Sequence, residues 1–181
     1  MITFRACSLI FIAVFIDLLI VPGAIYGEEV KRREYIIKAS FILKFPAFIE
    51  WPTKKSSFNV CVLADDPNIG IWENMEREKE NFSPFSLIPL RGFSNYTECN
   101  ILFVSGQKDD LMEKLISLTS GNPVLLIGDF PGYLEKGVGI NFLIKSNRVR
   151  FEINRDSLKK NHLEISSELL NLAYRVLEDK Q

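Results

Sequence analysis

Apolar and polar side chains alternate along two short runs near the carboxyl end of the chain. The runs fall between residues 137 and 154, and the polar residues 145–147 separate them. A period of two is typical of strands with one buried face, so this stretch predicts an antiparallel hairpin. The spacing lengthens to three or four over residues 165–176, which predicts an amphipathic helix capped by Ser166.

Upstream of the hairpin, short runs rich in apolar residues alternate with amphipathic stretches. The predicted strands are residues 58–64, 85–90, 99–104 and 123–127, and the predicted helices are residues 28–49, 68–80 and 111–118. Pro46 predicts a kink or an early end in the first helix, because proline lacks the amide proton of the helical ladder. Apolar strands that alternate with helices are typical of a parallel sheet covered on both faces. The expected fold class is therefore α/β: a three-layer α/β/α sandwich with a mostly parallel sheet, a C-terminal antiparallel hairpin and a closing helix.

The composition is that of one ordinary globular domain. The chain has 181 residues, of which 47% are apolar and 25% charged, enough for a single core. A formal net charge of −1 gives no basis for binding nucleic acid.

The amino terminus has the pattern of a secretory signal. Arg5 precedes an apolar run over residues 6–21, and small residues lead to the first charged pair at 28–29. We therefore expect residues 1–27 to be a cleavable signal peptide, cut after Ala24 or Gly27, and residues 28–181 to form one exported domain. A retained membrane anchor is the alternative, and Asp17 within the apolar run disfavours it.

Two cysteines, Cys61 and Cys99, remain once the signal is removed. An even pair in an oxidising compartment tends to be bridged, and both lie at or near the start of predicted strands. The residues alone are consistent with a disulfide or with two buried free thiols.

Six short segments, in this order and spacing, resemble the YfiR family of small periplasmic proteins. The segments are FIEWP (48–52), VCVL followed by DDP (60–67), CNILFVS (99–105), INF (140–142), RVRFEIN (148–154) and LEISSELLNLA (163–173). The resemblance runs from about residue 35 to residue 177, which is almost the whole expected mature chain.

The resemblance implies a regulator that is not an enzyme and needs no cofactor or metal. Members of this family repress membrane-bound diguanylate cyclases, so the expected partner is the periplasmic sensor region of an inner-membrane cyclase of the YfiN type. Repression would lower cyclic di-GMP and restrain biofilm formation, and an outer-membrane lipoprotein of the YfiB type would relieve it. The resemblance also implies a Cys61–Cys99 bridge, and a homodimer is a further expectation. The alternative is a periplasmic protein that binds a small ligand or a metal and feeds a membrane sensor kinase.

Four polar side chains follow the carboxyl ends of predicted strands, where ligands of parallel sheets usually bind. They are Asp65, Asp66, Ser105 and Asp129. They could form a ligand rim, but capping of turns and helices is the favoured interpretation. Ser105 lacks the Gly-x-Ser-x-Gly frame of a hydrolase nucleophile. We expect His162, the single histidine, or Asn161 to take a left-handed cap conformation instead of a catalytic role.

Arg148, Arg150 and Glu152 recur at two-residue spacing on one side of the second hairpin strand. A structural salt bridge, with Arg150 paired to Glu152, is the favoured interpretation. The alternative is an exposed contact with a partner protein.

Overall fold

A computed structural model describes residues 22–54, 56–78, 84–93 and 95–178. Contacts divide the chain into two units, Met1–Glu34 and Tyr35–Gln181. Helix α2 (Pro22–Lys44) begins in the first unit, where Arg33 and Glu29 form an exposed ion pair at 2.9 Å. Most of the expected signal peptide, residues 1–21, lies outside the described residues.

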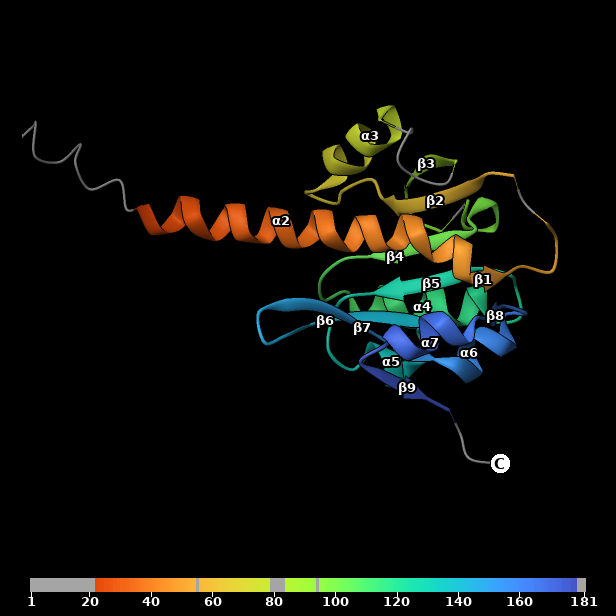
Figure 1. The fold of residues 1–181 in the computed structure, drawn as a ribbon. Coiled ribbons are helices and arrows are strands. Elements are labelled where there is room, and N and C mark those ends of the chain that lie inside the picture. Colours follow the sequence, from red (N-terminus) through yellow and green to blue (C-terminus); the bar gives the residue numbers. More distant parts are fainter. Residues whose placement is uncertain (1–21, 55, 79–83, 94, 179–181) are drawn as a thin grey trace, which may run out of the picture. The chain divides into compact units, whose positions relative to one another are not determined.

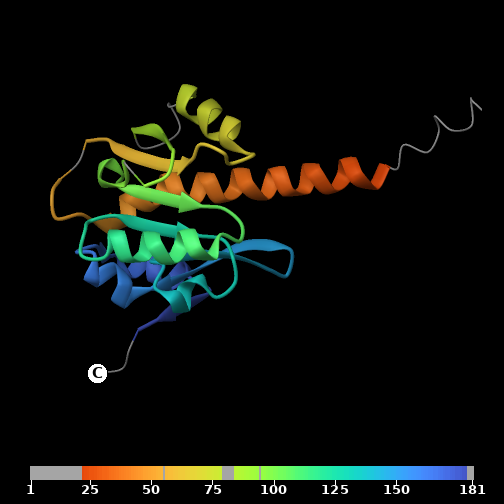
Figure 2. The ribbon, with the colours of Figure 1, turned by 180° about the vertical axis from the view of Figure 1, so that it is seen from behind.

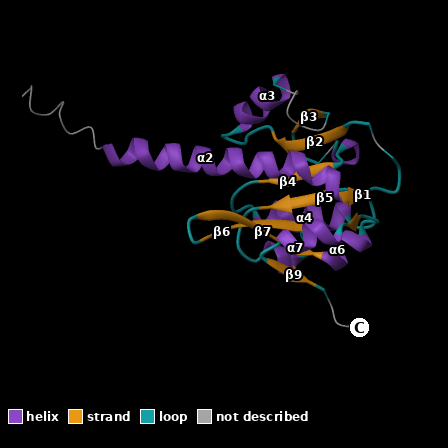
Figure 3. Cartoon of the chain, viewed as in Figure 1, coloured by secondary structure: helices purple, strands orange, loops and turns teal. Residues whose placement is uncertain are grey.

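The second unit is built on a seven-stranded sheet with the strand order β3-β2-β4-β5-β6-β7-β9. Its strands are β2 (Phe58–Leu63), β3 (Phe85–Leu90), β4 (Ile101–Val104), β5 (Leu125–Gly128), β6 (Ile140–Lys145), β7 (Arg148–Asn154) and β9 (Arg175–Leu177). All neighbouring strands are parallel except β6 and β7, which form the antiparallel hairpin. A separate two-stranded ribbon joins β1 (Ile49–Glu50) to β8 (Glu164–Ile165). Figure 1 shows the sheet and the helices around it, and Figure 3 marks helices and strands by colour.

Helices cover both faces of the sheet, and each face has its own apolar cluster. One cluster holds Tyr35, Ala39, Ile42 and Leu43 of α2, with Trp72 of α3 (Ile69–Arg77) and Leu169 of α7 (Ser167–Leu172). The other holds Met112 and Leu115 of α4 (Asp109–Thr119), together with α5 (Tyr133–Lys136). The view from behind shows α4 lying across this second face (Figure 2). The α/β fold with a mostly parallel sheet and a C-terminal hairpin is therefore confirmed.

Two local predictions are also confirmed. Helix α2 ends at Lys44 and continues as the 3-10 turn η1 (Phe45–Phe48), with proline in its first turn. The hairpin turns through Ser146 and Asn147, which have φ of 49° and 58°. Two successive positive φ values give the tight two-residue turn whose twist matches that of the strands.

The predicted closing helix over residues 165–176 is present, but it is shorter than expected. Helix α7 begins after Ser166, whose side chain accepts from the Leu169 amide as expected, but it ends at Leu172. The chain then becomes strand β9, because the open edge of β7 offers backbone partners to Tyr174 and the residues after it. Short helices that the sequence pattern did not predict, α5 and α6 (Arg155–Lys160), fill the connections around the hairpin.

Candidate functional site

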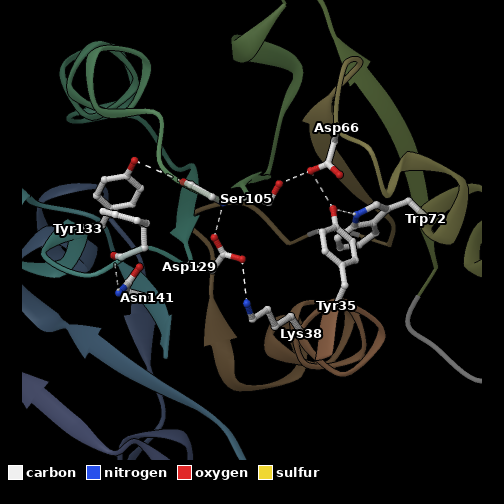
Figure 4. A network of polar contacts seen from close by, with 10 residues as sticks. Tyr35, Lys38, Asp66, Trp72, Ser105, Asp129, Tyr133 and Asn141 are labelled. Atoms are coloured by element: carbon white, nitrogen blue, oxygen red, sulfur yellow. Dashed lines mark hydrogen bonds and ion pairs between the residues drawn. The ribbon is translucent and has the colours of Figure 1, made fainter. Parts of the chain in front are cut away.

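The carboxyl ends of β2, β4 and β5 bring Asp66, Ser105 and Asp129 to one edge of the sheet, as the strand pattern predicts. Figure 4 shows them facing Tyr35 and Lys38, which project from α2. The site is therefore a junction between the sheet edge and one helix.

The Asp66 carboxylate is buried and already accepts several hydrogen bonds. The Tyr35 hydroxyl donates to its Oδ2 at 3.0 Å, and the Asn68 amide donates to its Oδ1 at 2.7 Å. The Ser105 hydroxyl donates to the same Oδ2, and the Trp72 indole donates to the Tyr35 oxygen at 2.9 Å. Several donors to one carboxylate offset the cost of burying it, so this cluster is satisfied from within the fold.

Burial and then the nearby Asp66 carboxylate raise the pKa of the Tyr35 phenol well above its ordinary value. The phenol therefore stays protonated and continues to donate at any physiological pH. This fixes Tyr35 as a structural donor and excludes it as a base near neutrality.

Asp129 takes part in a buried ion pair with Lys38. The Lys38 ammonium lies 2.9 Å from the Asp129 carboxylate, and each side chain is only 8% exposed. The Gly106 amide donates to the other carboxylate oxygen at 2.5 Å. The charge that a bound cation would neutralise is therefore already neutralised by a side chain of the same protein.

Asp65 does not join this cluster. Its side chain is 78% exposed, and its carboxylate lies 3.8 Å from the Lys108 ammonium. Such an exposed pair contributes little to stability. Of the four rim residues named from the sequence, the structure brings three together and leaves Asp65 outside.

Tyr133 and Asn141 extend the polar network along the second face. The Tyr133 hydroxyl accepts from the Lys108 amide at 2.6 Å, and the Asn141 amide donates to the Phe130 carbonyl at 3.2 Å. Gly128 makes room for them, because a Cβ there would lie 2.7 Å from the Tyr133 ring. The carbonyl oxygen of the Asn141 side chain is buried without a partner among the described residues.

Tyr35 and Lys38 were not among the site residues predicted from the sequence. Both lie on the buried face of α2, on the same stripe as the core residue Ile42. A lysine four residues before a core isoleucine is the signal that could have found the pair, because a buried lysine needs a partner.

The hairpin arginines and Glu152 do not form the expected salt bridge. Glu152 is buried, and its carboxylate lies 2.8 Å from the Arg175 guanidinium. Arg175 stands directly beside Glu152 in the β7–β9 register, whereas Arg150 lies opposite Leu143 of β6. Arg148 and Arg150 are exposed and form no ion pair within the part of the chain that the structure describes. The prediction of an Arg150–Glu152 pair is thus corrected, because β9 supplies the nearer cation.

Arg175 also contacts a second carboxylate, that of Glu135. The hydrogen bond from Arg175 is the main cause that lowers the pKa of Glu135. The Arg175 guanidinium therefore links β9 both to α5 and to β7.

The structure joins Cys61 of β2 to Cys99, which lies just before β4, with Cα atoms 5.7 Å apart. Both are buried beneath the second face of the sheet. The bridge links two neighbouring strands, as the resemblance implied.

His162 ends helix α6 with a φ of 57°, as expected of a left-handed cap. The amides of His162 and Leu163 donate to the carbonyls of Lys159 and Leu158 at 2.9 Å, the two bonds of a Schellman cap. The Ser105 hydroxyl, by contrast, donates to Asp66.

A cavity of about 450 Å³ lies beside this cap. Its lining includes Trp51, His162 and the facing pair Glu50 and Glu164 from the β1–β8 ribbon. Within the described residues, no group of three or more His, Cys, Asp or Glu side chains is arranged to hold a metal ion. No described helix combines the length and the apolar content needed to cross a bilayer.

A crystal structure of a conserved domain protein from Vibrio cholerae O1 biovar El Tor resembles this fold. Its TM-score is 0.53 at 9% sequence identity, and the likeness covers 78% of this chain and 60% of that chain. At this identity the likeness shows the fold alone. A search of curated proteins found no match. The family model described as YfiR/HmsC-like matches residues 35–174, the stretch that holds the sheet edge, the disulfide and the hairpin, and the chain therefore belongs to the YfiR/HmsC-like family.

Proposed function

We propose that this protein is a periplasmic, non-catalytic regulator that binds the sensor region of an inner-membrane diguanylate cyclase and holds the cyclase inactive. The observation that carries the proposal is the family match over residues 35–174. Membership of this family supports a role in regulating diguanylate cyclase signalling in general. The specific act of binding and inhibition is our proposal.

The disulfide supports the proposed location. The Cys61–Cys99 bridge would persist in the periplasm, whereas reducing systems keep most cytosolic thiols free. Together with the secretory pattern of residues 1–27, it favours a protein that meets the cyclase on the periplasmic side of the membrane.

The polar contacts at the carboxyl edge of the sheet support a structural role for Asp66 and Asp129. Asp66 and Asp129 receive their hydrogen bonds and their counter-charge from Tyr35, Ser105 and Lys38. A ligand or cation would have to displace these partners, at the cost of leaving buried charges unpaired. We therefore assign this edge to holding α2 against the sheet.

Repression follows from differential affinity. If the protein binds the inactive cyclase better than the active form, binding shifts the population toward the inactive form. A shift from 1:99 to 99:1 requires a ratio of about 10⁴ in the two affinities. A lipoprotein of the YfiB type that competes for this protein would reverse the shift and restore cyclic di-GMP synthesis.

Deletion of the gene in its own host, followed by complementation, tests the proposal. Loss of the protein should raise cellular cyclic di-GMP and biofilm mass, and the full-length chain should restore both. The same chain lacking residues 1–27 should accumulate in the cytosol and fail to restore either. Unchanged cyclic di-GMP in the deletion strain, with the protein demonstrably present in the parent, would contradict the proposal.

One observation favours a second candidate, the binding of a small ligand. The cavity beside His162, at about 450 Å³, falls within the usual size of small-molecule sites. Under this candidate a ligand at 100 times its dissociation constant would stabilise the protein by about 2.7 kcal/mol. A thermal-shift screen of metabolites and metals, repeated with Trp51→Ala, would detect it, and the candidate fails if no compound raises the melting temperature of the wild-type protein.

A further inference from the structure

Exposed apolar side chains gather near the carboxyl end of the chain. Among the described residues, six large apolar side chains are exposed, and four of them lie in the hairpin or in the stretch from α7 to β9. These four are Ile144, Leu172, Tyr174 and Val176. Isolated exposed apolar residues are ordinary, but a group on adjoining elements marks a site of interaction.

The same region ends the sheet with an open edge. Strand β9 pairs with β7 through Glu152, Ile153 and Asn154, and it is the last strand in the described order. Its outer side therefore presents backbone donors and acceptors to an added strand. Figure 1 shows β9 at the border of the fold and the β6–β7 hairpin projecting beyond the neighbouring strands.

The unpaired charges of the hairpin and β9 are of one sign. Arg148 and Arg150 are exposed and unpaired within the described residues. The nearby carboxylates have partners, because Glu152 pairs with Arg175 and Glu178 pairs with Arg155 and Lys159. The hairpin and β9 thus offer unpaired cations and no unpaired carboxylate of their own.

The two kinds of side chain lie on opposite faces of the sheet. Val176 stands beside Ile153 in the β7–β9 register, on the same face as Phe151 and Val149. Arg148 and Arg150 alternate with these residues and project from the other face. An extended segment bound along this edge, beside β9 and the free start of β7, would direct its side chains alternately to the two faces. Its apolar residues would lie on the face of Val176 and its acidic residues on the face that carries the arginines.

We propose that this edge surface, defined by Ile144, Arg148, Arg150, Leu172, Tyr174 and Val176, docks an extended segment of the cyclase sensor region in which apolar and acidic residues alternate. The proposal rests on the proposed function, whose contact surface it names. Charge complementarity selects this occupant over a second copy of the chain. A second copy would bring the same arginines and the same paired carboxylates to the contact, and like charges would face each other.

The test uses the full-length chain in its own host. The variant Arg148→Glu with Arg150→Glu reverses both charges, and Ile144→Ser with Val176→Ser removes apolar contacts from the other face. The matched control is Arg91→Glu with Lys160→Glu, because both residues are exposed and unpaired within the described residues. Each variant is expressed in the deletion strain. Its periplasmic abundance and melting temperature are measured together with cellular cyclic di-GMP.

We expect the wild type and the control to restore low cyclic di-GMP and both edge variants to leave it at the level of the deletion strain. Purified sensor region should bind the charge-reversed protein about tenfold or more weakly, and the wild-type association rate should fall with added salt. If an edge variant is unstable, Arg148→Gln with Arg150→Gln removes the charges with a smaller change and should show the same loss.

Three experimental outcomes would overturn different parts of the proposal. Normal repression by the charge-reversed variant would overturn the edge surface and leave the proposed function intact. No effect of the wild-type chain on cyclic di-GMP would overturn the proposed function, and the edge proposal with it. Dissociation of the purified protein from a dimer to a monomer in both edge variants, with unchanged affinity for the sensor region, would assign the surface to a second copy and overturn the proposed occupant.

Discussion

The carboxyl edge of the parallel sheet and the hairpin edge at β9 both carry charged side chains. The charges of the polar network are buried and paired at the sheet edge, and two arginines are exposed and unpaired within the described residues at the hairpin edge. At the sheet edge, Asp129 and Lys38 are buried against each other, and Asp66 receives donors from Tyr35 and Ser105. At the hairpin edge, Arg148 and Arg150 face solvent without a described partner.

The difference separates charges that hold the fold together from charges that are available to another molecule. A buried pair loses several kcal/mol when one member is removed, whereas an exposed, unpaired arginine contributes little to stability. The predicted effects on folding and on function should therefore fall on different residues.

Substitution at the buried pair should have the largest effect on stability. Lys38→Met leaves the Asp129 carboxylate buried and unpaired, and we expect a loss of about 3 to 5 kcal/mol in the free energy of unfolding. Urea denaturation measures it. Adding Asp129→Leu should recover most of the loss, because no buried charge then remains. Equal instability of the single and double variants would show that the ion pair does not hold this junction.

Loss of the disulfide should come next. The bridge spans 38 residues, and a loop of this length stabilises a protein by about 2 to 4 kcal/mol through restriction of the unfolded chain. Cys61→Ala with Cys99→Ala should lower the free energy of unfolding by this amount. A reducing agent should destabilise the wild type similarly and leave the variant unaffected. A variant as stable as the oxidised wild type would contradict the prediction.

Gly128→Ala should have an intermediate effect. The new Cβ would meet the Tyr133 ring at 2.7 Å and the Asn141 oxygen at 3.0 Å, so both must shift within a packed face. We expect a loss of about 1 to 3 kcal/mol, measured by urea denaturation. Gly70→Ala is the matched control, because the new methyl has open space around it and the backbone there has no positive φ. Unaltered stability of Gly128→Ala would show that this face is loosely packed.

Acid should loosen the β9 edge locally, and this is the smallest effect. Hydrogen bonds from Arg175 lower the pKa of Glu135, and those from Lys159 and then Arg155 lower the pKa of Glu178. A lowered pKa in the folded state means that the stabilisation is present above the ordinary value of 4.5 and is lost as pH falls through the folded pKa. Hydrogen-exchange protection of Arg175–Leu177 should therefore decrease as the pH falls below 4.5, before the central strands are affected. Glu178→Gln should weaken this pH dependence, and constant protection down to pH 3 would contradict the assignment.

Much of the fold could be predicted because its strongest patterns are local. The strands from Phe58 to Gly128 are short apolar runs, and apolar and polar residues alternate on both sides of the hairpin's polar turn, with Leu143 as the exception. Strand β9 could not be predicted, because three residues are too few to show a period of apolar and polar side chains. These residues also form a strand only by pairing with β7, which is distant in the sequence.

Part of the candidate site could likewise be predicted from the sequence, and part could not. The convergence of Asp66, Ser105 and Asp129 follows from the ends of parallel strands, which meet at one edge. Their partners Tyr35 and Lys38 lie on the apolar stripe of α2, which marks them as buried. Which carboxylates they meet depends on how α2 packs against the sheet, and the local pattern does not encode that. The Arg150–Glu152 pair was wrongly predicted for a similar reason, because the actual partner of Glu152 lies on strand β9, which could not be predicted.

In the proposed mechanism, the unpaired arginines of the hairpin edge, and not the acids of the sheet edge, make the regulatory contact. The most direct measurement is cellular cyclic di-GMP in the deletion strain complemented with two double variants at equal periplasmic abundance. Arg148→Glu with Arg150→Glu should leave cyclic di-GMP high, whereas Lys38→Met with Asp129→Leu should restore it to the wild-type level. The reverse pattern, with repression lost at the sheet edge and kept at the hairpin, would contradict the account.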